Sequence, residues 1–199
     1  MDSTEWDARY AASPELVWTG EPNRFVVEEL TALPAGTALD LAAGEGRNAI
    51  WLAGTGWQVT AVDFSPVAVR RGQQLADERG VSVQWQVADV LDYVPPADAF
   101  NVVLVAYLHL PAAELTSVLA RAQTGLATGG TLLVVGHDLA NLTDGTGGPQ
   151  DPAVLYTPDR IVTSLDGLHI RRAETARRPV VVDGRTTDAL DTVVVATHS

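Results

Sequence analysis

Residues 40–48 of the chain read Asp40-Leu41-Ala42-Ala43-Gly44-Glu45-Gly46-Arg47-Asn48. A short apolar run precedes the glycines and a helical pattern follows them, so the stretch joins a buried strand to a helix. In an open α/β sheet, ligands bind beyond the carboxyl ends of the strands. Gly44 and Gly46 leave room for a ligand near the backbone, and the amides that open the helix are unsatisfied. The stretch therefore predicts a strand, a ligand-binding turn and a helix.

The alternation of strand and helix continues on both sides of this turn. Ser65-Pro66 is a typical helix start and Gly80 a typical helix end. Asp183-Gly184 predicts the tight turn of an antiparallel hairpin. Strands are expected at residues 37–42, 58–62, 81–87, 100–106, 131–136, 168–175 and 188–197. The pattern predicts an α/β fold, with a Rossmann-like, mostly parallel sheet of seven strands, an antiparallel C-terminal hairpin and helices on both faces.

The 199 residues are enough for one α/β domain, so we expect residues 1–199 to form a single domain. Residues 1–33 precede the first strand and are expected to form an N-terminal helical cap. Residues 138–158 are long, polar and rich in glycine. A loop of this length in a compact domain is usually functional or mobile, so we expect it to lie on the substrate side.

Charge and composition exclude several classes of partner. The net charge is −12 and all 13 basic residues are arginine, which disfavours nucleic acid and anionic membranes as partners. The local basic cluster of the hairpin, Arg171, Arg172, Arg177 and Arg178, favours a solvated strand face over a small anion site. The acidic start lacks a secretory pattern and no apolar run could span a bilayer, so a cytoplasmic protein is expected. The oligomeric state stays open.

Three aspartates follow three consecutive predicted strands: Asp40, Asp63 and Asp89. Asp63 could accept hydrogen bonds from two ribose hydroxyls, and Asp89 from an adenine amino group beside the Val90 amide. The spacing of Gly44, Gly46 and Ala49 also fits a dinucleotide fingerprint, but carboxylates repel the diphosphate that such a turn holds. They favour a ligand with an ammonium and a sulfonium, as in S-adenosylmethionine. The acids therefore predict a crevice for a cationic adenosyl compound.

From Trp6 to Thr197 the chain resembles the class I S-adenosylmethionine-dependent methyltransferases. The glycine turn, the acids after the second and third strands, and the Gly129-Gly130 segment carry this resemblance, together with the closing hairpin. The opening of residues 6–10 and the Gly46-Arg47-Asn48 sequence resemble the small tellurite-resistance and thiopurine-type members. The resemblance implies S-adenosyl-L-methionine as cofactor, S-adenosyl-L-homocysteine as product and a small-molecule acceptor.

The resemblance also implies which residues hold each ligand. The implied cofactor contacts are Tyr10, Asp40, Ala42, Gly44, Gly46, Asn48, Asp63, Phe64, Asp89, Val90, Val105 and Ala106. The expected substrate-pocket residues are Trp6, Trp18, Tyr107, His109, His137 and Asp138. On a helix, Trp6 and Tyr10 share a face, where they either cover the cofactor or simply pack on the sheet.

His109 and His137 are the candidates for a catalytic proton acceptor, because each follows a predicted strand. A histidine that only satisfies strand-end backbone groups is the alternative at both positions. No cluster has metal-ligand spacing and the chain has no cysteine, so no metal is expected.

The expected function is methyl transfer from S-adenosylmethionine to a thiol, oxyanion, hydroxyl or amine of a small molecule. An NAD(P)-dependent oxidoreductase is one alternative, supported by the glycine spacing and Asp63. A protein that binds S-adenosylmethionine without catalysis is the other.

Overall fold

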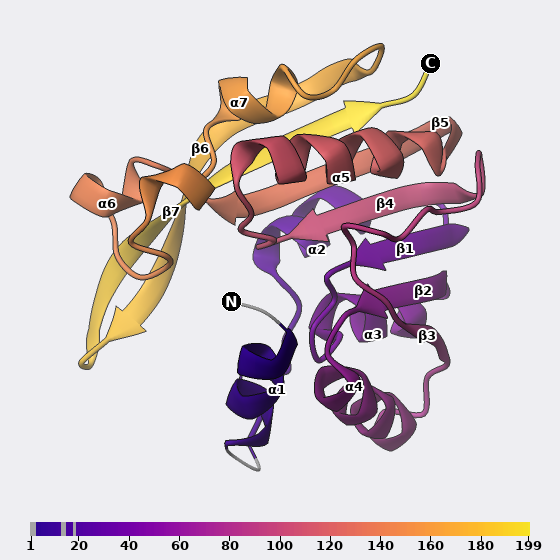
Figure 1. Ribbon diagram of the computed structural model, residues 1–199, viewed down its shortest axis with the longest axis horizontal. Helices are drawn as coiled ribbons and strands as arrows, with labels where there is room; N and C mark the ends of the chain where they lie inside the picture. The colour runs from indigo at the N-terminus through magenta and orange to yellow at the C-terminus, as the bar shows by residue number, and fades with distance from the viewer. Residues whose placement is uncertain (1–2, 13–14, 18) are drawn as a thin grey trace.

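The computed structural model describes residues 3–12, 15–17 and 19–199. Within these residues, seven strands form one sheet in the order β3-β2-β1-β4-β5-β7-β6 (Figure 1). The strands are β1 (Thr37–Leu41), β2 (Gln58–Asp63), β3 (Val83–Val87), β4 (Phe100–Ala106), β5 (Leu126–His137), β6 (His169–Val182) and β7 (Arg185–Thr197). β7 pairs antiparallel with both β5 and β6, and the other pairs are parallel. The predicted fold class is confirmed.

Helices connect and cover the strands. They are α1 (Ser3–Ala11), α2 (Arg24–Leu30), α3 (Arg47–Gly54), α4 (Pro66–Glu78), α5 (Ala112–Thr124), α6 (Asn141–Asp144) and α7 (Pro158–Val162), with a 3-10 helix η1 (Pro152–Val154). The predicted cap of α4 is confirmed, since the Ser65 hydroxyl accepts from the Ala68 amide at 3.0 Å. Among the helices of the described residues, none combines the length and the apolarity that crossing a bilayer requires.

Alternate residues of the central strands face two separate cores. Leu39 and Val103 pack with α5 on one face, whereas Ala38 and Val102 pack with α2 and α3 on the other. Both faces are apolar because a parallel sheet is covered on both sides by its crossover helices. Because β1, β4 and β5 are parallel neighbours in the sheet, their carboxyl ends lie side by side.

The closing hairpin is longer than the sequence indicates. β6 and β7 pair up to Val182 and Arg185, with one register shift between Ile170 and Arg172. The predicted turn at Asp183-Gly184 has φ values of 50° and 73°. The outer half of the hairpin extends beyond the rest of the sheet (Figure 1). Because both of its faces are largely exposed there, the outer half lacks the buried pattern by which a strand is recognised.

Other boundaries also differ from the predicted ones. β5 begins at Leu126, before the Gly129-Gly130 pair, and its register with β4 shifts between Phe100 and Val102. Residues 138–158 contain α6 and η1, and Tyr156 within them is fully buried. Among the described residues of the segment 1–33, two helices occur, α1 and α2. The roles of both regions stay predictions.

Candidate active site

The glycine turn lies between β1 and α3, as the sequence indicates. Gly44 and Gly46 have φ values of 58° and 77°, in the left-handed region that favours glycine. A Cβ on Gly44 would lie 2.9 Å from the Tyr10 hydroxyl, and one on Gly46 would collide with the Trp85 ring. Glycine is thus favoured here by the backbone conformation, and the side chains of Tyr10 and Trp85 occupy the space that a Cβ would take.

Asp40 is buried at the end of β1 and accepts a hydrogen bond from the Ala49 amide of α3. Its Oδ2 has no hydrogen-bond partner within the described residues. Burial raises the pKa of Asp40 from 3.8 to about 7, and the charge of Asp63 adds to this while Arg47 opposes it. A cation placed beside Asp40 would therefore be stabilised.

Asp63 ends β2 and supports the glycine turn. Its Oδ2 accepts from the Gly44 amide at 2.7 Å, and its Oδ1 accepts from the Ser65 amide at 2.9 Å. Burial raises the pKa of Asp63, and the charges of Asp7 and Asp89 raise it further against the two backbone hydrogen bonds. Each carboxylate oxygen has a second lone pair, so the carboxylate can still accept from a ligand.

The acids after β1, β2 and β3 lie close enough to influence one another. The Asp63 charge raises the pKa of Asp40, and the Asp89 charge raises that of Asp63. The expected convergence of these three carboxylates is present in the fold. Glu45 does not join them, since it forms an ion pair with Arg71 of α4 at 3.2 Å. The negative charge of Glu45 is therefore compensated by Arg71.

Helix α1 packs over the glycine turn. The Trp6 and Tyr10 rings are 5.5 Å apart on one face of this helix, and Tyr10 is buried. Asp7 of α1 accepts a hydrogen bond from the Ser65 hydroxyl at the start of α4. Trp18, the third predicted aromatic, lies outside the described residues. Helix α1 thus places Tyr10 beside the turn, while its role toward a ligand stays a prediction.

The remaining predicted cofactor residues lie in different surroundings. Val105 is fully buried in the core against α5, which does not support a direct ligand contact. Asn48 is buried, and its Oδ1 accepts from the Asn23 amide at 2.9 Å. Four other predicted contacts are partly buried and lie near strand ends: Ala42, Phe64, Asp89 and Ala106. Val90 is buried.

A buried carboxylate that sequence reasoning missed links the end of β4 to the middle of β7. Asp191 has no exposed surface. It accepts from the Tyr107 hydroxyl at 2.8 Å and from Arg178 Nε at 2.5 Å, and His137 Nδ1 lies 3.4 Å away. Although burial raises its pKa, the contacts with His137 and Arg178 bring the pKa of Asp191 below the ordinary value. The only sequence signal is a lone carboxylate within the apolar run of residues 189–196.

Tyr107 connects this carboxylate to the glycine turn. Its φ of 59° is unusual for a residue other than glycine and holds the side chain at the end of β4. Its hydroxyl also accepts from Asn23 Nδ2 at 3.0 Å. Through Asn23, Asn48 of α3 is linked to Tyr107 and so to Asp191. Nothing in the sequence marks Asn23 for this position.

The two candidate histidines lie together at the same edge. The rings of His109 and His137 stack with centroids 5.4 Å apart. His109 Nδ1 is 3.0 Å from the Val154 carbonyl, which can only accept, so this nitrogen carries the proton. Burial lowers the pKa of His109 to about 4, so the ring is neutral near pH 7 with its lone pair on Nε2.

Asp138 does not fit the predicted role of a substrate contact. It is buried, and its Oδ1 accepts from the Ala140 amide at 2.9 Å. Its Oδ2 accepts from the hydroxyls of Thr175 and Thr192 at 2.8 and 2.6 Å. Because both oxygens are engaged, Asp138 anchors the start of the 138–158 stretch to the hairpin.

The arginines of β6 are not a uniformly solvated face. Arg178 pairs with buried Asp191, and Arg172 forms ion pairs with Glu28, Glu29 and Glu174. Only Arg171 and Arg177 of the four are exposed. The solvated-face interpretation is therefore wrong for half of the cluster.

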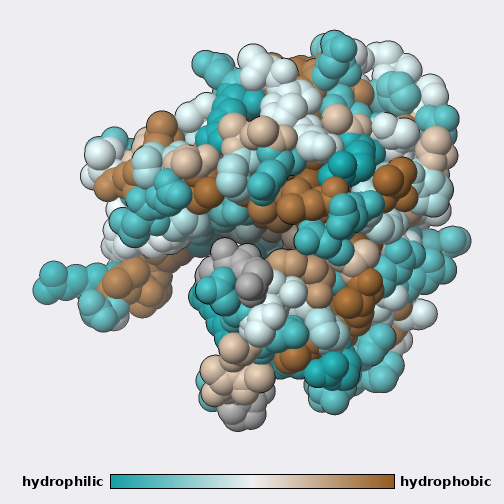
Figure 2. All heavy atoms as spheres, in the orientation of Figure 1, coloured by the Kyte–Doolittle hydropathy of each residue, from teal (hydrophilic) through white to brown (hydrophobic). Residues whose placement is uncertain are grey.

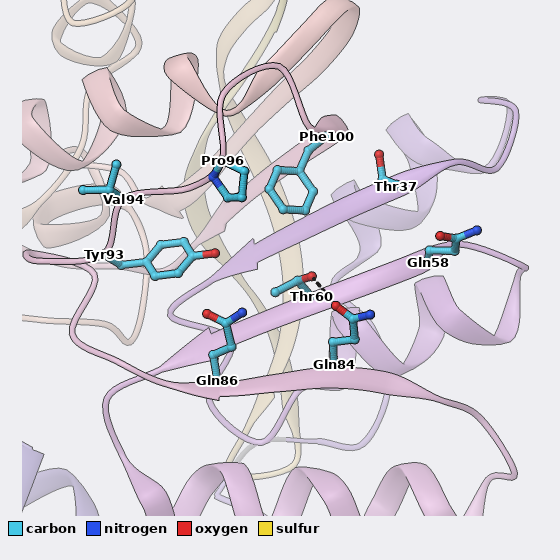
Figure 3. Close-up of a pocket in the computed structure, with 9 residues that line it drawn as sticks. All are labelled: Thr37, Gln58, Thr60, Gln84, Gln86, Tyr93, Val94, Pro96 and Phe100. Atoms are coloured by element: carbon cyan, nitrogen blue, oxygen red, sulfur yellow. Dashed lines mark hydrogen bonds between the residues drawn. The ribbon is translucent and has the colours of Figure 1, made fainter.

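A groove of about 410 Å³ lies away from these residues, on the open face of β1–β3 (Figure 3). Gln84 and Gln86 point into it, whereas Trp85 between them packs on α4 at Gly72. The groove exists because residues 88–99, which lead from β3 to β4, contain no helix to cover this face. The acids and the histidines are at the carboxyl ends of the strands and do not line it.

The sequence comparisons agree with this geometry. Residues 38–130 match the family model of a methyltransferase domain. Over 99 residues, the chain is 33% identical to a demethylmenaquinone methyltransferase from Thermus thermophilus, across 49% of this chain and 45% of that protein. These likenesses support a class I S-adenosylmethionine-dependent methyltransferase domain. The chain spans less than half the length of the curated relatives it matches.

Solved structures share the fold of this chain. The structure described as "Conversion of a Disulfide Bond into a Thioacetal Group during Echinomycin Biosynthesis" has a TM-score of 0.78 and 22% identity, over 99% of this chain and 92% of that one. Magnesium protoporphyrin IX methyltransferase from Synechocystis PCC 6803 with bound S-adenosylhomocysteine has a TM-score of 0.64 and 18% identity, over 99% and 83%. At these identities, the likeness concerns the fold.

Proposed function

We propose that the chain transfers a methyl group from S-adenosylmethionine to a small-molecule acceptor. The observation that carries the proposal is the cluster of Asp40, Asp63 and Asp89 at the glycine turn. The charge of Asp63 raises the pKa of Asp40, and the charge of Asp89 raises the pKa of Asp63. Oδ2 of buried Asp40 has no hydrogen-bond partner among the described residues. A sulfonium and an ammonium fit such a cluster, whereas a diphosphate is repelled by it.

Each acid has a defined part in this proposal. Asp63 would accept from the ribose hydroxyls with the lone pairs that the Gly44 and Ser65 amides leave free. Asp89 is partly exposed beyond β3 and would face the adenine. Asp40 would act through its charge, because it is buried beneath the turn. The bound cofactor supplies an already activated methyl group.

The remaining contribution of the protein is alignment and exclusion of water. Holding two reactants in an attack geometry can contribute several kcal/mol, on the order of 7 in favourable cases. On the acceptor side, neutral His109 is suited to accept a hydrogen bond from a protonated nucleophile through Nε2. Such a contact orients the acceptor without requiring a strong base.

The proposal is tested first by thermal unfolding with S-adenosylhomocysteine and, separately, with NAD and NADP. At 100-fold excess over the dissociation constant, binding adds about 2.7 kcal/mol, or roughly 5–10 °C in melting temperature at this size. Stabilisation by NAD or NADP alone would assign an oxidoreductase instead. Transfer of labelled methyl groups to thiols, hydroxyls, amines or oxyanions then distinguishes an enzyme from a protein that only binds the cofactor.

A further inference from the structure

Two arginines from distant parts of the chain flank the Tyr107 ring. The Arg47 guanidinium of α3 and the Arg178 guanidinium of β6 each lie 5.7 Å from the ring centroid. Arg47 directly follows the glycine turn, so this cluster borders the proposed cofactor site. In Figure 2 the molecule is hollowed between the protruding hairpin, to which Arg178 belongs, and the lower part of the body.

The two arginines differ in how their charges are compensated. Arg178 is paired with Asp191 at 2.5 Å. In the part of the chain that the structure describes, no carboxylate lies within 4.0 Å of the Arg47 guanidinium, and no hydrogen bond engages it. Two carboxylates act on Arg47 through their charges: Asp40, whose charge is weakened by burial, and Asp191, which is already paired with Arg178. One positive charge in excess thus sits beside Tyr107, in a chain whose net charge is −12.

This excess charge is held in a rigid setting. Burial lowers the pKa of Arg47, which expresses the cost of keeping its charge partly out of water. Asp191 fixes both Arg178 and the Tyr107 hydroxyl, and Asn23 donates to the same hydroxyl. A guanidinium that is partly desolvated, unpaired and close to a second one is a typical site for a carboxylate or another oxyanion.

We propose that Arg47 and Arg178 bind an anionic group of the methyl acceptor beside Tyr107. The inference rests on the proposed methyl transfer, and it narrows the acceptor to molecules with a carboxylate or a similar oxyanion. Asp63 ends β2 and Asp89 follows β3, on one side of β1, whereas Tyr107 follows β4 and Asp191 belongs to β7, on the other side. The acids would face the adenosine, and the arginines would face the acceptor.

The test uses benzoate as the anionic probe and benzamide as its neutral match. Both are titrated into the protein saturated with S-adenosylhomocysteine, and dissociation constants are measured by saturation-transfer NMR. We expect benzoate to bind about tenfold or more tightly than benzamide, and Arg47→Gln to remove this preference. Arg70→Gln removes the same charge from an exposed position of α4 and should leave the preference intact.

Several results would overturn the inference. The first is equal affinity of the wild-type protein for benzoate and benzamide. This measurement does not depend on the folding of any variant. Another is an Arg47→Gln protein that binds benzoate normally but loses affinity for S-adenosylhomocysteine and not for 5′-methylthioadenosine. That pattern would assign Arg47 to the carboxylate of the cofactor, because methylthioadenosine lacks the amino-acid part.

The two proposals fail in different ways. If calorimetry detects no binding of S-adenosylhomocysteine, the proposed function falls. The benzoate titration of the free protein then still tests the arginine pair. If S-adenosylhomocysteine binds and benzoate shows no preference over benzamide, only the anionic acceptor is overturned.

Discussion

The two sides of the candidate active site are built in different ways. The side formed by β1, β2 and β3 carries acids at or just beyond the carboxyl ends of these strands, around one glycine turn. The side formed by β4 and β7 depends on Asp191, whose partners Tyr107 and Arg178 come from other strands. Tyr107 and Asp191 are 84 positions apart. The first side is thus a local motif repeated at adjacent strands, and the second is a network that exists only in the folded chain.

The comparison predicts the largest effect for Asp191→Ala. Removing this buried carboxylate leaves Arg178 without its partner and the Tyr107 hydroxyl without its acceptor. We expect a loss of about 3–5 kcal/mol in the free energy of unfolding, measured by urea denaturation. The matched control is Asp188→Ala on the same strand, whose partner Arg177 is 70% exposed, and it should cost less than about 1 kcal/mol. Similar losses for the two variants would contradict the network.

On the other side of the site, the raised pKa of Asp40 predicts that the stability of the fold depends on pH. Its pKa is about 7 in the folded chain and 3.8 ordinarily, so the folded state holds more protons between these values. The free energy of unfolding should therefore fall as pH rises from about 4 to about 7, by at most about 4 kcal/mol from this group. Asp40→Asn keeps an acceptor for the Ala49 amide and should flatten the profile. Identical slopes for variant and wild type would show that Asp40 does not cause the dependence.

Asp63→Ala tests the cofactor side through binding. We expect the affinity for S-adenosylhomocysteine to fall by about 2–4 kcal/mol in calorimetry, because two charge-assisted hydrogen bonds are lost. The Gly44 and Ser65 amides also lose their acceptor, so a moderate loss of stability accompanies it. A variant with unchanged affinity would mean that Asp63 only supports the turn.

The smallest expected effects on stability are those of replacing one glycine on each side of the site by alanine. A Cβ on Gly136 of β5 would collide with the Tyr156 ring, which is fully buried and cannot move aside. Gly136→Ala should therefore cost about 1–3 kcal/mol of unfolding free energy. A Cβ on Gly72 of α4 would meet Trp85, which is only partly buried. Gly72→Ala should cost less, since alanine also favours the helix by about 1 kcal/mol. The reverse order in thermal unfolding would contradict this difference in rigidity.

The sequence alone predicted the fold class, the glycine turn and the cap of α4. These features depend on neighbouring residues, since hydrophobic periodicity and capping act over a few positions. The two strands of the hairpin were predicted too short, because the outer half of the hairpin is exposed on both faces and carries no burial pattern. Asp138 was expected at the substrate, and only the fold shows that Thr175 and Thr192 engage it.

By itself, the sequence determined the alternation of strands and helices and the acids after β1, β2 and β3. Parallel strands bring their carboxyl ends to one edge, so consecutive motifs converge without further information. The tertiary structure alone decided that Asp191 joins Tyr107 to Arg178, that Arg71 neutralises Glu45, and that Arg47 is left without a carboxylate partner among the described residues. Ion pairs and buried hydrogen bonds depend on which distant side chains meet, and local sequence patterns do not contain this information.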